Sequence, residues 1–475
     1  MANKKKNWRA SLLIIVFLLT LGALGRFSFL EQLKNTAGSQ AAPLEATGYT
    51  PTFVLDLGDV EARNYQRMGS IEALLDFSPD EKFLAVGTEL GEIIAVQKDP
   101  PQVSWREKIG IGKITALKFS ADGAFLYVGE ASPEGSLLCL DAKTGRTLWR
   151  YAAAPAIGVD LKRKSLPAIV KIEVREGKVY ALAMRYGSRA DTGKENYYYS
   201  KIFCFDSAGN PIWAFPADYM DAWVNWLSVD EIGGQVVFGT ANYAETVRAY
   251  TKNIYALNAL TGTANWSAEI PPILEAKRTV TRGSPNISAD GQMVTALASD
   301  GRGFAYDKNG NLLWSRAIST PKLNGSVYLN AVGRDAYVLG NYVVFGTLNT
   351  YNSANWQLPT PVEHPSSNNL VVFDRAGNFK SRWQAGGSIE EVSFSYPYAA
   401  IAVGRNTKTK DYTVHGLYIY NLELGEITGQ IKTDGPAIAA AVCAQGKSVA
   451  VVETPLKLDD GKILGKYRLT IAAKI

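Results

Sequence analysis

The sequence has few of the residues that build disulfides, metal sites and catalytic triads. Among 475 residues there are three cysteines and two histidines, namely Cys139, Cys204, Cys443, His364 and His415. An odd number of widely spaced cysteines excludes a disulfide framework, a CxxC redox pair and a CxxCH haem site. Two histidines leave little for a histidine-dependent triad or a multi-histidine metal site. We therefore predict no catalytic residue, no metal site and no cofactor.

A strongly basic surface is also missing. The chain carries 50 Lys and Arg against 45 Asp and Glu, a net charge of +5. Four of the basic residues precede the first apolar run, so the rest of the chain is close to neutral; they are Lys4, Lys5, Lys6 and Arg9. Nucleic-acid binding requires a basic face that displaces counterions from the phosphates. The composition therefore indicates that nucleic acid is not a partner.

One long apolar run is present, near the N-terminus. Residues 1–9 are basic, residues 10–25 carry no charge, and the apolar character resumes after Arg26. The positive charges predict that 1–9 stays in the cytoplasm and that the chain after Arg26 lies outside. We predict a single-pass transmembrane signal-anchor over 10–30 in the cell membrane, followed by a linker over 31–50. The alternative is a cleaved signal peptide, which would leave a secreted or periplasmic protein.

Beyond residue 50 the chain repeats itself. The recurring phrase is an apolar strand, an Asp or Asn, a turn with Gly, and a Trp four residues after the Gly. The Asp or Asn side chain caps the turn, Gly takes the positive-φ position, and a hairpin results. A Trp at one fixed offset is expected to fill the same gap between neighbouring units. Copies end at Trp149, Trp213, Trp266 and Trp314, and looser copies occupy 370–383 and 417–431.

Two of the cysteines belong to this repeat. Cys139 and Cys204 fall at matching positions of two copies. Other copies carry small or aliphatic residues at that position, namely Ala256, Ala305, Val372 and Ile419. Free cysteine often behaves as a small buried hydrophobe. The repeat therefore predicts a buried slot for a small side chain.

A second phrase, consisting of a strand, a polar turn and another strand, precedes the first in several units, as at 74–87, 117–129 and 286–297. Each unit therefore supplies four strands, which is typical of propeller blades. We predict an all-β, eight-bladed β-propeller of four-stranded antiparallel blades over 51–475; seven blades would require two units to merge. The last unit has three strands, and residues 52–60 are expected to supply its fourth and close the ring. The units begin near Ile71, Ile114, Ile169, Trp223, Thr281, Ala331, Ile389 and Ala437.

These phrases carry a family resemblance. The D-x-x-x-G-x-x-x-W phrase, clearest at Asp141, Gly145 and Trp149, resembles the repeat of pyrroloquinoline-quinone-type propellers. The FSPD and FSAD turns resemble those of WD-type repeats. The resemblance covers about residues 50–475 and implies a β-propeller. The family includes quinoprotein dehydrogenases and non-catalytic scaffolds, such as the propeller subunit of the outer-membrane β-barrel assembly machinery.

The sequence lacks a feature that the resemblance to the dehydrogenases would imply. Those enzymes typically hold the quinone beside a disulfide of two adjacent cysteines and near a calcium bound by carboxylates. No two cysteines of this chain are adjacent. The neighbouring carboxylates Glu390–Glu391 and Asp459–Asp460 are expected on solvated loops or strand ends. In character the chain is therefore closer to the non-catalytic envelope scaffolds.

The repeats differ most in the connection between their second and third strands. Equivalent connections in a propeller emerge at the same face, so long ones should lie together. Aromatic and amide groups suit protein partners or sugar rings. The long connections occupy 185–200, 241–253, 348–368, 405–415 and 454–466. We predict a partner-binding face with Tyr186, Tyr197, Tyr198, Tyr199, Tyr243, Tyr250, Tyr351, Trp356 and Tyr412; alternatively, these loops only cap the disc.

The sequence thus favours a non-catalytic, membrane-tethered scaffold outside the cytoplasm that engages an envelope protein or glycan. The alternative is an enzyme, either a quinone-dependent dehydrogenase or a propeller that acts on polysaccharides. A sensory ectodomain would need a cytoplasmic output module, and residues 1–9 are too short for one.

Overall fold

The computed structural model describes most of the chain beyond the predicted leader. The described residues are 45–64, 72–110, 112–162, 164–187, 197–232, 234–241, 250–273, 275, 279–352, 362–404 and 411–475. The predicted signal-anchor over 10–30 lies outside them. Within these ranges, no helix has both the length and the apolar character needed to cross a membrane.

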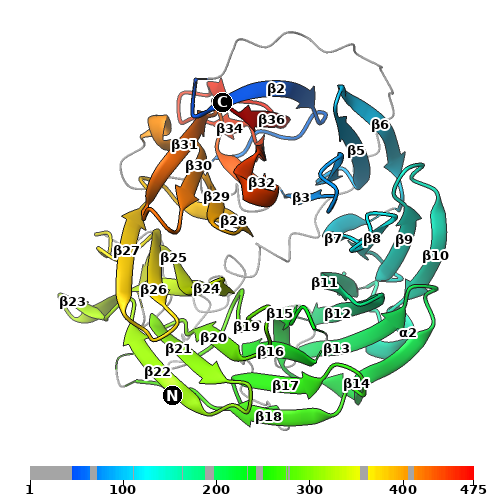
Figure 1. Cartoon of the computed structure of the whole chain (residues 1–475), viewed down its shortest axis with the longest axis vertical. Coiled ribbons are helices and arrows are strands. Elements are labelled where there is room, and N and C mark those ends of the chain that lie inside the picture. The colour runs from blue at the N-terminus through cyan, green and yellow to red at the C-terminus, as the bar shows by residue number, and fades with distance from the viewer. Residues whose placement is uncertain are drawn as a thin grey trace, which may run out of the picture.

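The described chain forms antiparallel sheets arranged in a ring (Figure 1). Within each run of four successive strands, the first lies toward the centre of the ring and the last lies at the rim (Figure 1). Such a run is called a unit below. This is the all-β, propeller-like arrangement that the repeats predict.

Four of the sheets have four strands each. The first three are built from β3 (Ala73–Phe77), β4 (Phe83–Thr88), β5 (Glu92–Lys98) and β6 (Pro101–Lys108); from β15 (Trp223–Val229), β16 (Gln235–Ala241), β17 (Ile254–Asn258) and β18 (Ala264–Ala268); and from β19 (Asn286–Ile287), β20 (Met293–Leu297), β21 (Arg302–Asp307) and β22 (Leu312–Ala317). The fourth contains β32 (Ala437–Val442), β33 (Ser448–Glu453), β36 (Arg468–Lys474) and β2 (Tyr49–Asp56).

Three sheets are larger. An eight-stranded sheet contains β7 (Lys113–Phe119), β8 (Phe125–Ala131), β9 (Ser136–Asp141), β10 (Thr147–Ala152), β11 (Ala168–Arg175), β12 (Lys178–Gly187), β13 (Tyr197–Asp206) and β14 (Pro211–Met220). The two five-stranded sheets contain β23 (Lys322–Asn324), β24 (Val327–Leu339), β25 (Tyr342–Asn352), β26 (Asn369–Asp374) and β27 (Phe379–Gln384), and β28 (Ile389–Ser395), β29 (Tyr398–Val403), β30 (Gly416–Asn421), β31 (Glu426–Lys432) and β1 (Ala46–Thr47).

Short elements lie in the connections. They are the helix α2 (Ala154–Ile157), the 3-10 turns η2 (Tyr412–Val414) and η3 (Ala444–Gly446), and the two-stranded hairpin of β34 (Leu456–Lys457) and β35 (Ile463–Leu464).

The two ends of the described chain meet in one sheet. β2 pairs antiparallel with β36, from Tyr49 opposite Lys474 to Asp56 opposite Arg468. The closure predicted from residues 52–60 is therefore confirmed, although the strand lies slightly earlier in the chain. β1 also pairs with β31, the outer strand of the preceding unit. The segment from Glu45 to Asp56 thus joins two units and covers part of their open edges.

The turns between third and fourth strands have the predicted chemistry. The carboxylate of Asp141 accepts hydrogen bonds from the backbone N–H groups of Lys143 and Thr144, and Gly145 has a φ of +74°. This is the Asx-capped hairpin expected from the repeat. Five other residues occupy the same position, and each accepts a hydrogen bond from a backbone N–H group two to four residues later in the chain. They are Asp206, Asn258, Asp307, Asp374 and Asn421.

Tryptophans fill one repeated position, the tryptophan slot, in the outer strands of five units. The register pairs Trp149 with Cys139, and a bulge immediately precedes the Trp. The Trp149 ring lies against Gly209 in the turn of the next unit, and its Nε1 donates to the Ser207 carbonyl at 3.0 Å. A side chain on Gly209 would collide with the indole, which explains the glycine. Equivalent contacts are made by Trp105, Trp213, Trp266 and Trp314.

The residue that pairs with each slot is small or aliphatic and buried. Cys139 and Cys204 hold this position, and both are fully buried free thiols. Ala256 and Ala305 take the same place opposite Trp266 and Trp314. The predicted small-residue slot is confirmed.

Three outer strands have another residue in the tryptophan slot. In β27 the register places Ser381 there, not Trp383, which lies two residues further on and packs against Tyr418. The prediction that the tryptophan of this looser copy, Trp383, fills the slot was therefore wrong. In β31 the slot holds Gly429, and in β2 it holds Phe53. Conversely, Trp105 was missed, because its unit lacks the Asp–Gly turn.

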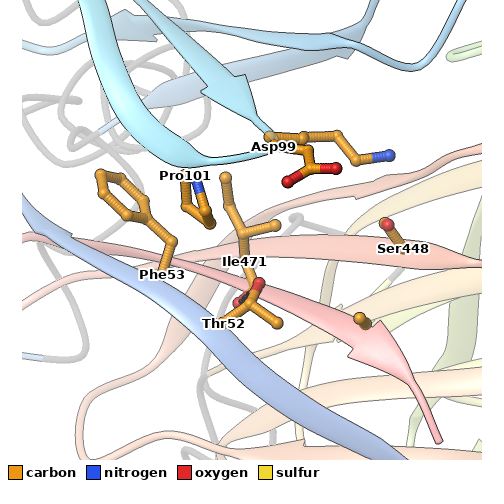
Figure 2. Close-up of a pocket in the computed structure, with 8 residues that line it drawn as sticks. Thr52, Phe53, Asp99, Pro101, Ser448 and Ile471 are labelled. Carbon is orange, nitrogen blue, oxygen red and sulfur yellow. Dashed lines mark hydrogen bonds between the residues drawn. The ribbon is translucent and has the colours of Figure 1, made fainter.

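The boundary between β2 and the first unit contains a small cavity. Phe53 lies beside Pro101 and Ile471, with Asp99 across the gap (Figure 2). The cavity has a volume of about 270 Å³ and is lined by Thr52, Phe53, Lys98, Asp99, Pro101, Ser448, Ile471 and Ala473. Phenylalanine is smaller than tryptophan and has no N–H group, so this boundary lacks the hydrogen bond made at the other five.

Candidate binding face

Connectivity divides the ends of the units between two faces. The turns between first and second strands, and between third and fourth strands, share one face, called the turn face. The connections between second and third strands, and between units, share the opposite one, called the insertion face. All five long connections predicted from the sequence therefore belong to the insertion face. Within them, residues 188–196, 242–249, 353–361 and 405–410 lie outside the described part of the chain.

The first long connection begins as an extension of a regular hairpin. β12 and β13 remain paired up to Gly187 opposite Tyr197, with Tyr186 opposite Tyr198. Side chains alternate between the two sides of a strand. Tyr197 and Tyr199 therefore face one side of this hairpin, and Tyr198 faces the other.

On one side the tyrosines surround Arg185. The guanidinium lies 4.3 Å from the ring centre of Tyr199 and 5.4 Å from that of Tyr197. Its Nε donates to the carbonyl of Ile157, the last residue of the short helix α2, at 2.8 Å. Tyr219 of β14 completes the group, with its ring centre 4.3 Å from that of Tyr199. Stacking of a guanidinium on aromatic rings holds this cation in place.

This group, the Arg185 cluster, is partly open to solvent. Arg185 itself is only 9% exposed, whereas Tyr219 is 42% exposed. Burial raises the pKa of the Tyr199 hydroxyl, so it is a neutral donor at physiological pH. The cluster presents rigid aromatic rings and phenolic hydroxyls around a fixed positive charge. Tyr and Arg are the residue types that contribute most to protein interfaces.

On the other side of the hairpin lies a second aromatic group. Tyr186 contacts Tyr198 with ring centres 5.2 Å apart. Tyr198 stacks on Trp223 at 6.1 Å and 9°. Arg282 lies 5.8 Å from the centre of the Trp223 ring. Because Tyr198 is 2% exposed, its ring packs beneath the surface against Tyr186 and Trp223 and is not itself available to a partner.

The remaining predicted aromatic residues do not join these two groups. Tyr250 packs against Phe215 of β14 and against Tyr255 of β17 in the next unit. Tyr412 lies in η2, with its ring 6.0 Å from that of His415. Tyr351 belongs to β25, where its backbone is opposite Asn330. Tyr243 and Trp356 lie outside the described residues.

Sequence reasoning missed the residues that complete the site. Arg185 lies within the predicted connection 185–200 but was overlooked because only aromatic residues were selected there. Tyr219 was overlooked because it belongs to an outer strand, and Trp223 and Arg282 because they follow other connections. One signal was available for Tyr219: the connection after it leads to the same face as the second-to-third-strand connections.

Both histidines are structural. His364 is 3% exposed; its Nδ1 accepts from the Ser366 N–H at 3.0 Å and its Nε2 lies 2.8 Å from the Thr320 carbonyl. Burial lowers the pKa of both His364 and His415. Neutral, enclosed imidazoles of this kind fix loop conformation.

The innermost strands gather charged side chains at the centre of the ring. Lys118 of β7 binds Asp76 of β3, with Nζ 2.9 Å from Oδ1. In β11, Glu173 lies 3.1 Å from Lys171 and 3.4 Å from Arg175. The pKa of the Glu173 carboxyl is lowered, because the attraction of these cations outweighs burial.

Aromatic side chains fill the space beside this network. Trp226 of β15 contacts Tyr337 of β24 with ring centres 6.3 Å apart, and Tyr337 contacts Phe394 of β28 at 4.5 Å. The ammonium of Lys171 sits 4.0 Å above the Trp226 ring. The cation therefore occupies one face of the Trp226 ring.

The predicted solvated position of Glu390 and Glu391 was wrong for Glu391. Both lie in the inner strand β28, and Glu391 Oε2 accepts from the Ala440 N–H of the next unit at 3.0 Å. Burial raises the pKa of the Glu391 carboxyl to about 7. By contrast, Asp459 and Asp460 are exposed at the β34–β35 hairpin, as predicted.

The described residues do not fit the quinone site that the dehydrogenase resemblance implies. The three cysteines are buried and free, on separate elements, so they cannot form the disulfide of adjacent cysteines. Within the described ranges, no group of three or more His, Cys, Asp or Glu is positioned to hold a metal ion. The carboxylates of the inner strands are instead engaged by Lys118, Lys171, Arg175 and backbone N–H groups.

Comparison with known proteins places this geometry in a family. The family described as outer membrane protein assembly factor BamB matches residues 70–213 and 198–395. No curated protein sequence matches the chain significantly.

Several solved structures are similar. BamB from Moraxella catarrhalis aligns with a TM-score of 0.52 and 14% identity, covering 90% of this chain and 99% of that one. The quinohemoprotein alcohol dehydrogenase ADHIIG from Pseudomonas putida HK5 aligns with a TM-score of 0.57 and 11% identity, covering 90% and 76%. A europium-containing methanol dehydrogenase has a TM-score of 0.50 and 12% identity, covering 82% and 89%. At these identities the structural similarity establishes the propeller fold alone.

The family match extends from the start of the first unit into β28. It agrees with the Asp–Gly–Trp phrase and with the tryptophan slots that this phrase builds. The chain therefore belongs to the BamB family of PQQ-like repeat β-propellers.

Proposed function

We propose that this chain is a non-catalytic scaffold of the cell envelope that binds a protein partner through its insertion face. The observation that carries the proposal is the Arg185 cluster, in which an arginine is held between tyrosines on the insertion face. The description of the family names outer-membrane protein assembly. A glycan is the alternative ligand, because the same rings could stack on sugars.

The proposal includes an architecture of eight blades over 51–475. The eight-stranded sheet would count as two blades, because β8 and β11 share only the pair Ala131 and Ala168. β23 and β1 would be additions to the edges of four-stranded blades. Each four- or five-stranded sheet supplies one blade, and the β34–β35 hairpin supplies none.

The proposal also includes a membrane tether formed by residues 10–30, with the propeller outside the cytoplasm. Its support is the basic segment 1–9 followed by the apolar run. An envelope location agrees with the family description. Cleavage of the leader would leave the propeller in the periplasm or secreted, with the same binding face.

An enzymatic function is less well supported. The dehydrogenase neighbours share the fold at 11% and 12% identity. The carboxylates on the axis are bound to cations and backbone groups, and the cysteines lie apart. No observation on the described residues favours a polysaccharide-cleaving site.

The test uses the combined substitution Tyr197→Ala, Tyr199→Ala and Tyr219→Ala. We expect proteins cross-linked to the full-length wild-type chain in envelope membranes to be lost by about tenfold or more, because hot-spot aromatics contribute about 2 kcal/mol or more each. The matched control is Tyr396→Ala, which removes a 39% exposed tyrosine from the turn face. Equal cross-linking by the folded triple variant and the control would contradict the proposal.

A further inference from the structure

Three exposed aliphatic side chains mark the connections of the insertion face. Leu161 is 63% exposed, Leu323 is 59% exposed and Ile463 is 55% exposed. Leu161 lies between β10 and β11, Leu323 in β23, and Ile463 in β35. α2, β23 and β34 lie at three separate places around the ring (Figure 1), so the three connections that carry these residues are spread around it.

Each of these side chains is held in a defined turn. Asp160 and Ser165 exchange backbone hydrogen bonds around Leu161. Leu323 pairs with Tyr328 in the β23–β24 hairpin. Ile463 pairs with Lys457 in the β34–β35 hairpin. Exposed aliphatic groups on ordered tips are unfavourable in water unless something covers them.

Exposed lysines accompany all three. Lys162 and Lys164 follow Leu161, which Asp160 precedes, and Lys322 precedes Leu323. The third tip has Lys457, Lys462 and Lys466, but also the exposed acids Asp459 and Asp460. Its net charge is therefore weakly positive, and it should be the weakest of the three in any contact with an anionic surface.

The turn face provides the contrast. It also exposes aliphatic residues, namely Ile232 at 61%, Leu260 at 58% and Leu424 at 64%. Glu231 precedes Ile232, Glu423 precedes Leu424, and Leu260 has uncharged neighbours. Exposed apolar groups thus occur on both faces, but lysine accompanies them only on the insertion face among the six tips compared.

The chain also leaves the ring on the insertion face. Glu45 immediately precedes β1, and its carbonyl accepts from the Lys432 N–H at the end of β31. That end of β31 leads to the connection between units, which belongs to the insertion face. The 44 residues that precede Glu45, including the apolar run, are therefore attached at this face.

We propose that the insertion face rests on the surface of an anionic lipid bilayer, with Leu161, Leu323 and Ile463 entering the headgroup region and the neighbouring lysines contacting lipid phosphates. This rests on the proposed tether, which would bring the face to the membrane. Apolar insertion and lysine–phosphate attraction together determine interfacial binding. The Arg185 cluster would then be presented at the membrane surface, where a membrane-embedded partner could reach it.

The experiment places a fluorophore at single tips of the full-length chain. Leu161→Cys and Leu323→Cys are labelled with an environment-sensitive dye and reconstituted in bilayers of phosphatidylcholine, with or without phosphatidylglycerol. The native cysteines are buried, and burial raises the pKa of Cys139 and Cys204 to about 12, so they should not compete for the label. Leu260→Cys, on the turn face, is the matched control.

We expect a blue shift at Leu161→Cys and Leu323→Cys in the anionic bilayers, and none at Leu260→Cys. Replacement of Lys162, Lys164 and Lys322 by Gln should abolish this shift, since each lysine near an anionic surface contributes about fivefold in affinity. Identical spectra for the three labelled positions would overturn the proposal.

A second measurement separates this proposal from the proposed function. The lysine variant is tested for cross-linking to envelope proteins after solubilisation in detergent, where no bilayer is present. Retained cross-linking together with a lost blue shift supports both proposals. If a blue shift of the same size appears in bilayers without phosphatidylglycerol, the electrostatic contact proposed here is wrong, whatever the fate of the protein partner.

Discussion

Five boundaries between neighbouring units are closed by a tryptophan, whereas the boundary between the last unit and the first, called the closing boundary, has Phe53 in the same position. At the first kind, the indole covers a turn glycine of the next unit and donates to a turn carbonyl. At the second, a cavity of about 270 Å³ remains beside the phenylalanine. The difference indicates that the closing boundary depends on the buried core between the two units, where Ile94 clusters with Ala450 and Leu469, rather than on a ring that docks on the next turn.

The boundary between the β28–β31 unit and the last unit uses a third arrangement. Its slot holds Gly429, and the ring of Tyr49 lies against that glycine. The Tyr49 hydroxyl donates to the Gly446 carbonyl at 2.8 Å. An aromatic ring from the N-terminal segment thus replaces the missing tryptophan. One segment, Glu45 to Asp56, therefore stabilises two boundaries in different ways.

The largest effect is expected from Tyr49→Ala, which removes the substitute ring. Tyr49 is 2% exposed, and loss of a buried aromatic side chain costs about 4 kcal/mol of unfolding free energy. Denaturant-induced unfolding followed by tryptophan fluorescence measures it. Tyr49→Phe, which loses only the hydroxyl bond, should cost about 1 kcal/mol. If the two variants were equally stable, Tyr49 would not be the residue that closes this boundary.

A boundary that is closed by a tryptophan is tested by Trp314→Ala. Trp314 is 9% exposed, lies against Gly377 and donates to the Arg375 carbonyl at 2.9 Å. We expect a loss of about 3 kcal/mol, measured in the same way. The control is Trp383→Ala, a tryptophan of the neighbouring unit that is outside the slot. A larger loss from Trp383→Ala would show that the slot has no special role.

Two boundaries differ in the carboxylate that joins their inner strands, Asp76 between β3 and β7 and Glu391 between β28 and β32. Asp76 accepts from the Phe119 N–H and is paired with Lys118. Glu391 accepts from the Ala440 N–H, and burial raises its pKa to about 7. A carboxyl whose folded pKa lies above its unfolded value makes the protein more stable as pH falls from about 7 toward about 4.5, and its full penalty applies above pH 7.

Glu391→Gln should therefore stabilise the protein at pH 8 by about 2 kcal/mol, with a much smaller gain near pH 5. The amide oxygen retains an acceptor for the Ala440 N–H. Thermal unfolding at the two pH values measures the difference. The same gain at both pH values would mean that the carboxyl is ionised at neither pH or is not penalised by burial.

The smallest effect is expected from filling the cavity. In Phe53→Trp, the indole should occupy part of the space beside Pro101 and donate to the Lys98 carbonyl, which corresponds in register to the acceptors at the other boundaries. We expect a gain of about 1 kcal/mol. The reverse change, Trp105→Phe, should lose about as much at the adjacent boundary, which is closed by a tryptophan. A loss from Phe53→Trp would show that the closing boundary has no room for the larger ring.

The site was only partly predictable. The placement of Tyr186 and Tyr197 to Tyr199 in one long connection followed from comparing repeats. Strand alternation through Tyr197–Tyr199 could have shown that Tyr198 faces the opposite side. Nothing in the local sequence brings Tyr219 or Arg282 to these tyrosines, because they come from different strands and connections.

The sequence by itself determined the strands, the capped turns, the tryptophan slots that follow them and the closure by an N-terminal strand. These features depend on residues a few positions apart, or on a repeat that reports its own spacing. Only the tertiary structure decided which residue fills the slot where the phrase is degenerate, as at Ser381, Gly429 and Phe53. It also decided that Glu391 is half-buried and that Arg185 sits between tyrosines. In each case the physical reason is packing between units, which joins residues whose distance along the chain carries no periodic signal.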